Sequence, residues 1–403
     1  MSRGLKLEGL ALHDLLERFG SPLHVVHAAA LDRNVQAFQG AGDIFYSYKT
    51  NPVPGVLRRL HARGVGAEVI SPYELWLAER LGVPGSRTVF NGPAKSGEAV
   101  ARAVARGVLI NLNHREEIDA VARVAESVGK TARVGVRVVT RRGWSGQLGL
   151  RIDGGEALAA FEAALAKPRL RVAALHAHFG PPLRSRAALC GFVDELLRFC
   201  DVLHARLGVS PEVLDFGGGL ALPNVTENGA TRSKLSVREY VRTIASRVAR
   251  HFRRARREHP RIALEPGRAL TGSAQLLLTR VVSSREVPGG RSYLMLDAGT
   301  NLAGAMRFES HRVLPVSRAG AAPSHRYALV GPLCSPSDVL SEGVRLPRLA
   351  PGDSLAILDA GAYFVPYQTN FSFPRPAIVM VERGRARLLR RAERFADLVA
   401  FDS

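Results

Sequence analysis

The sequence is poor in cysteine: its 403 residues include only Cys190, Cys200 and Cys334. An odd and sparse set without a CxxC pair excludes a disulfide framework and offers no zinc motif. Cys190 and Cys200 stand in apolar segments with a helical pattern, so we expect them in a core. Cys334 stands between Gly-Pro and Ser-Pro, in "GPLCSPSD", and needs a separate explanation.

The chain also lacks any apolar run near the roughly 20 residues that a membrane helix needs. Its first 25 residues mix acids and bases among the apolar positions, which is not the pattern of a signal peptide. Hydrophobic residues make up 46% and charged residues 23% of the chain, as in globular proteins. These features predict a cytoplasmic globular protein of about two domains.

Acidic residues are scarce relative to basic ones, and the formal net charge is +20. Such a charge could indicate nucleic-acid binding. The densest basic segment, residues 247–261, instead resembles one solvated face of a helix, and no aromatic residues alternate with the basic ones. We therefore predict no nucleic-acid partner, and an acidic partner or a carboxylate-rich substrate explains the charge equally well.

What the sequence does contain is a regular alternation of short apolar runs and helical segments. Eight runs have the length and composition of strands, and helix-like stretches separate them. The strand candidates are residues 43–48, 66–71, 87–92, 109–113, 133–139, 172–179, 212–219 and 261–267. This pattern predicts a parallel (β/α)₈ barrel over residues 25–270, with a doubly wound sheet as the alternative.

After Arg268 the pattern changes to short β-type runs separated by glycine and proline. Residues 271–403 therefore predict an all-β domain, either a sandwich or a barrel. Residues 1–24 could belong with either part, and we place them provisionally with the β domain. The overall expectation is an α/β barrel followed by a C-terminal all-β domain.

Lys49 stands in "YSYKTNP", at the end of the first predicted strand. A lysine at a strand end is most often a solvated charge. The alternative is an amine held in a pocket and kept reactive by partial desolvation, as lysines that form Schiff bases are. The choice depends on what stands at the other strand ends, because barrel active sites lie there.

The other predicted strand ends carry a consistent set of polar residues and glycines. Any one of them has an ordinary explanation, such as a turn or a structural hydrogen bond. They are Glu68, Arg137, His176, His178, Gly217, Gly218, Gly219, Glu265 and Arg268. Together they offer an acid, an imidazole face, an arginine and a backbone-amide nest, the groups needed to hold pyridoxal phosphate (PLP).

Seven motifs in the same order extend this interpretation. "YSYKTNP", "GAEVISPYELWLAERLGVP", "HAHFG", "LDFGGGL", "EPGR", "GPLCSPSD" and "GAY" resemble the PLP-dependent decarboxylases of the alanine-racemase fold. This family includes the diaminopimelate, ornithine and arginine decarboxylases, and "FNGPAKS" and "LDAGTN" are most similar to the diaminopimelate branch. The resemblance covers about residue 20 to the C-terminus.

The resemblance implies a role for each matching residue around the cofactor ring. Lys49 matches the Schiff-base lysine, and His178 matches the histidine that stacks on the ring. Glu265 matches the acid on the pyridine nitrogen, and Glu68 matches an acidic group near the ring. Arg137 matches a basic residue behind the cofactor.

The resemblance also implies a phosphate site and a shared subunit interface. Gly218 and Gly219, with Arg268, match the phosphate cradle, and Tyr363 matches a tyrosine near the phosphate. The family is a head-to-tail homodimer, in which the residue matching Cys334 reaches into the partner's site and helps to protonate the substrate carbon.

Several substrate-reading positions depart from the family pattern. Ser335 replaces a glutamate that reads the distal amino centre of diaminopimelate, whereas Asp338 matches an acid that contacts a substrate amine. Arg307 is displaced from the family's Arg-Pro pair, Pro181 replaces a serine, and Gln147 begins "QLG" in place of "KFG". We therefore expect decarboxylation of another diamino acid or of a conjugated amino acid, with diaminopimelate as the alternative.

Two further alternatives have a different chemistry. A racemase of this fold would leave the pyridine nitrogen facing an arginine, and Glu265 argues against it. A non-catalytic PLP-binding protein would be a lone barrel, whereas this chain has a second domain carrying Cys334 and Tyr363.

Overall fold

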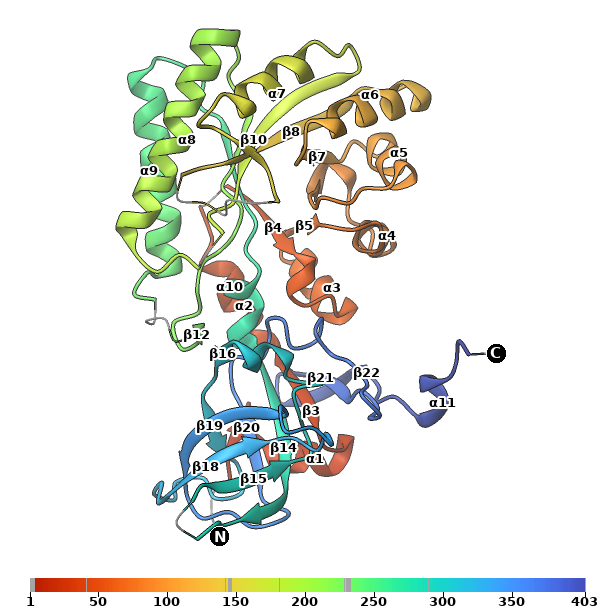
Figure 1. Ribbon diagram of the computed structural model, residues 1–403, viewed down its shortest axis with the longest axis vertical. Helices are drawn as coiled ribbons and strands as arrows, with labels where there is room; N and C mark the ends of the chain where they lie inside the picture. The colour runs from red at the N-terminus through yellow and green to blue at the C-terminus, as the bar shows by residue number, and fades with distance from the viewer. Residues whose placement is uncertain are drawn as a thin grey trace.

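The computed structural model describes residues 4–40, 42–141, 143, 147–180, 182–227, 229, 233–288 and 290–402 of the chain. Within these residues a barrel and a second, sheet-rich domain lie one above the other along the long axis of the molecule (Figure 1). Two strands from different parts of the chain join them, and the candidate site lies near this junction.

In the described part of the chain, eight parallel strands close into a barrel, because β10 pairs with β8 as well as with β11. The strands are β4 (Asp43–Ser47), β5 (Gly66–Val69), β6 (Thr88–Phe90), β7 (Leu109–Leu112), β8 (Ala132–Val139), β10 (Leu170–Ala177), β11 (Val213–Asp215) and β13 (Arg261–Leu264). The short β9 (Leu150–Arg151) pairs with the end of β8. The predicted barrel is confirmed, and the closing pair excludes the doubly wound alternative.

All eight strand candidates are strands, but most of the predictions ran past the observed ends. The segment predicted over 212–219, for example, is a strand only over Val213–Asp215. Most of the extra residues follow the observed strands and form the loops at their carboxyl ends.

Helices surround the barrel and cover its apolar strands (Figure 1). They are α2 (Ala28–Gln36), α3 (Pro54–Ala62), α4 (Pro72–Arg80), α5 (Gly97–Ala105), α6 (Glu116–Val128), α7 (Glu156–Leu165), α8 (Arg186–Leu207), α9 (Val237–Arg254) and the short α10 (Arg268–Thr271). Serine begins α4, α5, α8 and α9, where the hydroxyls of Ser71, Ser96, Ser185 and Ser236 accept a backbone N–H of the first turn. None of the described helices combines the length and apolarity needed to cross a membrane.

The second domain contains a mostly antiparallel sheet built from distant parts of the chain. Its strands are β3 (Leu23–His27), β14 (Gln275–Arg285), β15 (Ser292–Leu296), β17 (Val313–Pro315), β18 (His325–Val330), β19 (Val339–Leu346), β20 (Ser354–Ile357), β21 (Ala377–Glu382) and β22 (Arg385–Arg390). The predicted C-terminal β domain is confirmed. The sequence did not predict β19, because Gly343 interrupts its apolar pattern. It also did not predict β3, which lies between β14 and β21.

Short elements complete the described chain at its ends. The N-terminal residues form the hairpin β1 (Lys6–Leu7) and β2 (Leu10–Ala11) and then α1 (Leu12–Phe19), which packs on the second sheet. The helix α11 (Phe395–Leu398) lies near the C-terminus. Cys200 is buried in the barrel core, as expected, whereas Cys190 is only partly buried.

A two-stranded ribbon connects the barrel to the second domain (Figure 1). The loop after β11 contributes β12 (Thr226–Glu227), and the second domain contributes β16 (Glu309–Ser310) after the turn η4 (Gly304–Arg307). In this antiparallel pair Glu227 stands directly opposite Glu309.

Candidate active site

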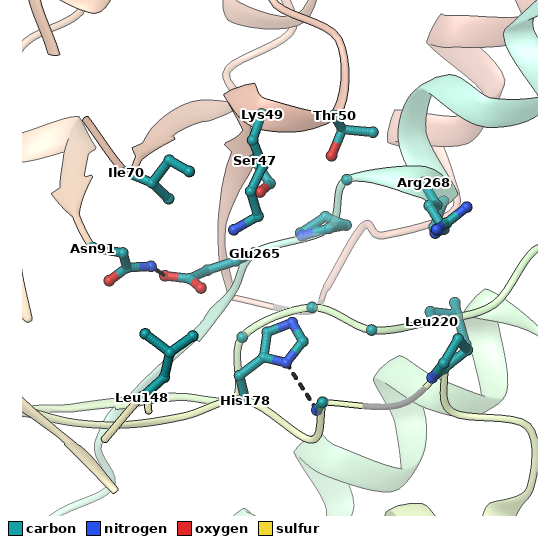
Figure 2. A pocket seen from close by; sticks show the side chains of 18 of the residues that line it. Ser47, Lys49, Thr50, Ile70, Asn91, Leu148, His178, Leu220, Glu265 and Arg268 are labelled. Atoms are coloured by element: carbon teal, nitrogen blue, oxygen red, sulfur yellow. Dashed lines mark hydrogen bonds between the residues drawn. The ribbon is translucent and has the colours of Figure 1, made fainter. Parts of the chain in front are cut away.

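A cavity of about 610 Å³ opens at the carboxyl ends of the barrel strands (Figure 2). Most of its lining comes from strand ends and loops of the barrel, and Phe308 and Tyr363 of the second domain complete it. The residues predicted for the site that line it are Lys49, Arg137, His178, Gly218, Gly219, Glu265, Arg268 and Tyr363. The volume suits a small-molecule ligand, and the position is that of active sites in this fold.

Lys49 lies in the 3₁₀ turn that follows β4, and its side chain enters the cavity (Figure 2). Its Nζ lies 3.6 Å from Oε2 of Glu68, and the hydroxyl of Ser47 donates to the same oxygen. Burial lowers the pKa of Lys49, but Glu68 and the neighbouring Glu265 outweigh burial, and the pKa is raised. Desolvation therefore does not decide the direction of the pKa shift of this amine in the chain by itself.

Asn91, directly after β6, holds the two carboxylates of the cavity together. Its Nδ2 donates to Oε1 of Glu265 at 2.7 Å and to Oε1 of Glu68 at 3.0 Å. Nδ2 of Asn111 donates to Oδ1 of Asn91 at 2.8 Å, which fixes the orientation of the amide. Asn111 needs the space beside Gly135, because a Cβ there would lie 2.1 Å from its Oδ1.

Glu265, directly after β13, lies next to a layer of polar residues inside the barrel. His176 is in register with Arg137 of β8 and with Asp215 of β11, and its Nε2 lies 3.3 Å from Oε2 of Glu265. Burial would raise the pKa of Glu265, but His176 and Asn91 lower it to about 2. Burial and the charge of Glu265 raise the pKa of Asp215. Glu265 is therefore the ionised member of the two acids.

His176, Asp215 and Glu265 also offer ligand atoms within 4.8 Å of one another, a spacing that could hold a metal ion. Arg137 and Lys49 line the same cavity and add two positive charges close to these groups. Those charges disfavour a metal cation at this point. The cluster suits a ligand that brings a single N–H donor to Glu265.

His178 follows β10 and presents its imidazole to the cavity, across from Lys49 (Figure 2). The backbone N–H of Gly180 donates to its Nδ1 at 2.9 Å, so the hydrogen of the neutral ring is on Nε2. Burial, with the charges of Lys49 and Arg137, lowers the pKa of His178 to about 3. The neutral ring therefore offers a flat face to a planar ligand.

The three glycines after β11 form a loop that only glycine can build. Gly217 and Gly219 have φ angles of +61° and +95°, in the left-handed region. Gly218 contacts the chain closely, since a Cβ there would lie 2.4 Å from the backbone oxygen of Glu265. Successive backbone N–H groups in such a loop form a nest for an anion.

Arg268 lines the cavity, yet two acids already pair with its guanidinium. Nη1 donates to Oε1 of Glu309, and Nη2 lies 3.4 Å from Oε1 of Glu227. The guanidinium also lies over the ring of Tyr363, 4.5 Å from the ring centre. Burial lowers the pKa of Arg268, but Glu309 and Glu227 outweigh it and raise the pKa. Tyr363 itself has a φ of +65°, a strained backbone conformation at the cavity wall.

Four residues predicted to take part in catalysis or substrate binding do not line the cavity of this chain: Cys334, Ser335, Arg307 and Asp338. Cys334 is exposed in the turn between β18 and β19. Ser335 shares a hydrogen bond with the hydroxyl of Ser337 at 2.8 Å. Arg307 is exposed, and its Nη2 lies 3.4 Å from Oγ1 of Thr300. Pro181 lies outside the described residues.

Asp338, predicted to contact a substrate amine, is buried within the second domain of this chain. Its side chain is buried and accepts hydrogen bonds on both oxygens. Oδ1 accepts the N–H and hydroxyl of Thr300, at 2.6 and 2.9 Å, and Oδ2 accepts the N–H of Leu333 at 2.9 Å. The carboxylate therefore fixes two turns of the second domain, and its contact with a substrate amine stays a prediction.

Sequence reasoning missed several residues that build the site. Asn91 had a usable signal, because it stands directly after a predicted strand in "FNG", and Asp215 was inside the quoted "LDFGGG". Glu227 and Glu309 had no local signal. They come together only through the pairing of β12 with β16, which joins segments about 80 residues apart in sequence.

Comparison with known proteins agrees with this geometry. Residues 27–272 match the family described as pyridoxal-dependent decarboxylase, pyridoxal binding domain. The chain is 30% identical to the diaminopimelate decarboxylase of Archaeoglobus fulgidus, over 98% of this chain and 96% of the relative. It is 32% identical to that of Deinococcus radiodurans, over 98% and 99%.

A solved structure shows the same arrangement of both domains. The diaminopimelate decarboxylase of M. jannaschii superposes on this chain with a TM-score of 0.90 at 26% identity, covering 99% of this chain and 96% of the other. A second structure of the M. jannaschii enzyme, in complex with L-lysine, gives a TM-score of 0.90 at 25% identity and covers 100% and 97%.

Proposed function

This chain belongs to the pyridoxal-dependent decarboxylases, and we propose that it removes the α-carboxylate of an amino acid with a second amine on its side chain. The cofactor is PLP and the reaction is a decarboxylation, in line with the family and its relatives. What supports the proposed assignment of the site is that an amine, an ionised carboxylate, an imidazole face and a glycine nest line one cavity.

The residues of the cavity fit PLP in kind and in number. Lys49 supplies the amine for the aldehyde, and ionised Glu265 supplies the acceptor for a protonated pyridine nitrogen. His178 supplies a face for the ring, and the loop of Gly218 and Gly219 supplies the nest for the phosphate. When bound, PLP takes up the electron pair that remains on Cα after carbon dioxide leaves.

We assign the residues around these groups to holding charge and protons in place. Asn91 and His176 keep Glu265 ionised, so that the ring nitrogen retains its proton. Glu68, 3.6 Å from Nζ of Lys49, is the acceptor for the proton that the amine must release before it can act as a nucleophile.

The substrate class follows from the relatives and from the departures in this chain. The relatives are named diaminopimelate decarboxylases, and one solved structure holds L-lysine, a compound with two amines. Ser335 and the displaced Arg307 depart from the pattern that reads diaminopimelate. We therefore favour a diamino acid other than diaminopimelate, with diaminopimelate itself as the second candidate because of the relatives' names.

We also propose that two chains form a head-to-tail dimer with shared sites in the cytoplasm. Cys334 is an exposed free thiol outside the cavity of its own chain, as expected if it serves the partner's site. There it would deliver the proton to Cα after carbon dioxide leaves. A reducing compartment keeps such a thiol free.

One experiment tests the proposed function. The purified protein with PLP is incubated with a panel of amino acids, and released carbon dioxide and the product amine are measured. We expect release from at least one diamino acid, and none from the Lys49→Ala variant. Exchange of the Cα hydrogen with solvent without release of carbon dioxide would favour a racemase instead. Absence of both reactions, with PLP bound, would contradict catalysis.

A further inference from the structure

The cavity contains an arginine whose charge is already neutralised, and this limits the substrates that the enzyme can accept. We infer that Arg268 is unavailable to a substrate carboxylate, so that the enzyme selects a diamino acid with one carboxylate over a diamino acid with a second, distal carboxylate. The inference rests on the proposed decarboxylase function and specifies its substrate class.

Both terminal nitrogens of the Arg268 guanidinium already pair with acids of the same chain. Nη1 donates to Glu309, Nη2 pairs with Glu227, and the face of the group lies over Tyr363. An arginine that binds a carboxylate presents both of its parallel N–H donors to it. Arg268 has already committed these donors to two acids of its own chain.

Glu309, one of the two acids that pair with Arg268, is held in place by a second contact. The side chain of Glu309 is completely buried, and its Oε2 lies 3.0 Å from Nε2 of His311. Nδ1 of His311 lies 3.0 Å from the carbonyl oxygen of Leu358, which can only accept. Glu309 is therefore held by His311 through one oxygen and by Arg268 through the other. Glu227 adds a second carboxylate beside the guanidinium, so two acids face the single charge of Arg268.

Separating Arg268 from Glu227 and Glu309 would cost free energy. Glu227 and Glu309 stand directly opposite each other in the β12–β16 ribbon, and like charges in that position repel each other. Arg268 lies between them and compensates both. If it moved to a substrate, it would leave a buried carboxylate without its partner, which is strongly unfavourable. The acids of the β12–β16 ribbon therefore keep Arg268 in its position between the two domains.

Because Arg268 lines the cavity, its pairing with two acids affects which substrate side chains the cavity can accept. Figure 2 shows Arg268 on one side of Lys49, with Asn91 and Glu265 on the other. A side chain that extends from the reacting carbon toward Arg268 meets a guanidinium that two carboxylates already face, with Glu227 on the cavity wall. An added carboxylate would find no free cation there, whereas a terminal amine can share the carboxylate of Glu227.

The test compares two substrates that differ by one carboxylate. The kcat/KM values for L-lysine and for meso-diaminopimelate are measured with the PLP-loaded enzyme. We expect L-lysine to be better by about tenfold or more, because a site without a counter-charge rejects the extra carboxylate. Equal values, or a preference for diaminopimelate, would overturn the inference and leave decarboxylation standing. Carbon dioxide from neither compound would overturn the inference, whereas the proposed function is contradicted only if the whole panel of amino acids gives none.

Two variants test whether the pairing of Arg268 with acids causes this substrate preference. Glu309→Gln and Glu227→Gln each remove one acid from Arg268 and should shift the ratio of the two kcat/KM values toward diaminopimelate, by about tenfold. Glu98→Gln, at an exposed position of α5, is the matched control and should leave the ratio unchanged. Glu227 is on the cavity wall, so its variant serves if Glu309→Gln fails to fold. An unchanged ratio in the folded variants would overturn the role of the pairing.

Discussion

The side-chain amide of Asn91 donates to Glu265 at 2.7 Å, and the same nitrogen donates to Glu68 at 3.0 Å. One amide thus joins the acid assigned to the ring nitrogen of PLP and the acid that pairs with Lys49. It keeps two buried carboxyl groups at fixed positions relative to each other. The contact couples the binding of the cofactor to the state of the lysine.

Replacement of Asn91 by alanine should therefore reduce both cofactor affinity and turnover. Glu265 would lose a hydrogen bond to a charged group, which typically contributes ~1.5–3 kcal/mol. We expect kcat/KM to fall by about 10–100-fold, with a weaker Kd for PLP measured by absorbance. Asn34→Ala, which removes an amide outside the cavity, is the control. Unchanged PLP affinity in Asn91→Ala would contradict the assigned role.

PLP should attach to Lys49 and not to Lys95, a second lysine with a buried side chain. Lys95 has a side chain that is only 2% exposed, and burial lowers its pKa, but it pairs with Glu117 outside the cavity. Borohydride reduction followed by peptide mapping should therefore label Lys49 alone. Lys49→Ala should lose the visible absorbance of the bound cofactor, and Lys95→Ala should keep it. Label on the peptide that contains Lys95 would contradict the assignment.

Sequence reasoning could propose Lys49 as the reactive lysine but could not describe its charge environment. The strand end, the motif and the neighbouring glycines were local signals, and the barrel followed from eight local patterns. The raised pKa of Lys49 depends on Glu68 and Glu265, which reach it from other strands. The pairing of Arg268 with Glu309 likewise depends on a contact between domains, and no local pattern carries such a contact.

The glycine loop provides a steric prediction. Gly218→Ala would place a Cβ 2.4 Å from the backbone oxygen of Glu265, so the loop or the strand end must move. We expect the Kd for PLP to rise by at least about tenfold, ~1.4 kcal/mol, because the phosphate nest is distorted. Gly97→Ala is the matched control, since nothing lies within 4 Å of a Cβ there. Equal PLP affinity in the two variants would refute the proposed nest.

His178 gives a prediction about acid stability of the protein without cofactor. Its folded pKa is about 3, against 6.5 for a free histidine, so the unfolded chain binds one more proton between these values. Its contribution to stability is therefore complete above pH 6.5 and is lost as the pH falls toward 3, by about 1.4 kcal/mol per pH unit. The free energy of unfolding of wild type minus that of His178→Gln should fall with this slope between pH 6 and 4. The same pH dependence in wild type and His178→Gln would contradict this prediction.

Subunit complementation tests the shared site. In a head-to-tail dimer Lys49 of one chain and Cys334 of the other serve the same cavity, so Lys49→Ala and Cys334→Ala chains should each be nearly inactive alone. When they are mixed and allowed to exchange, half of the dimers are hybrids, and each hybrid has one site with both native residues. Activity should therefore recover to about a quarter of the wild-type value. A site contained within one chain predicts no recovery beyond the sum of the two variants. Subunit exchange, verified by a tag on one chain, makes a lack of recovery decisive against the shared site.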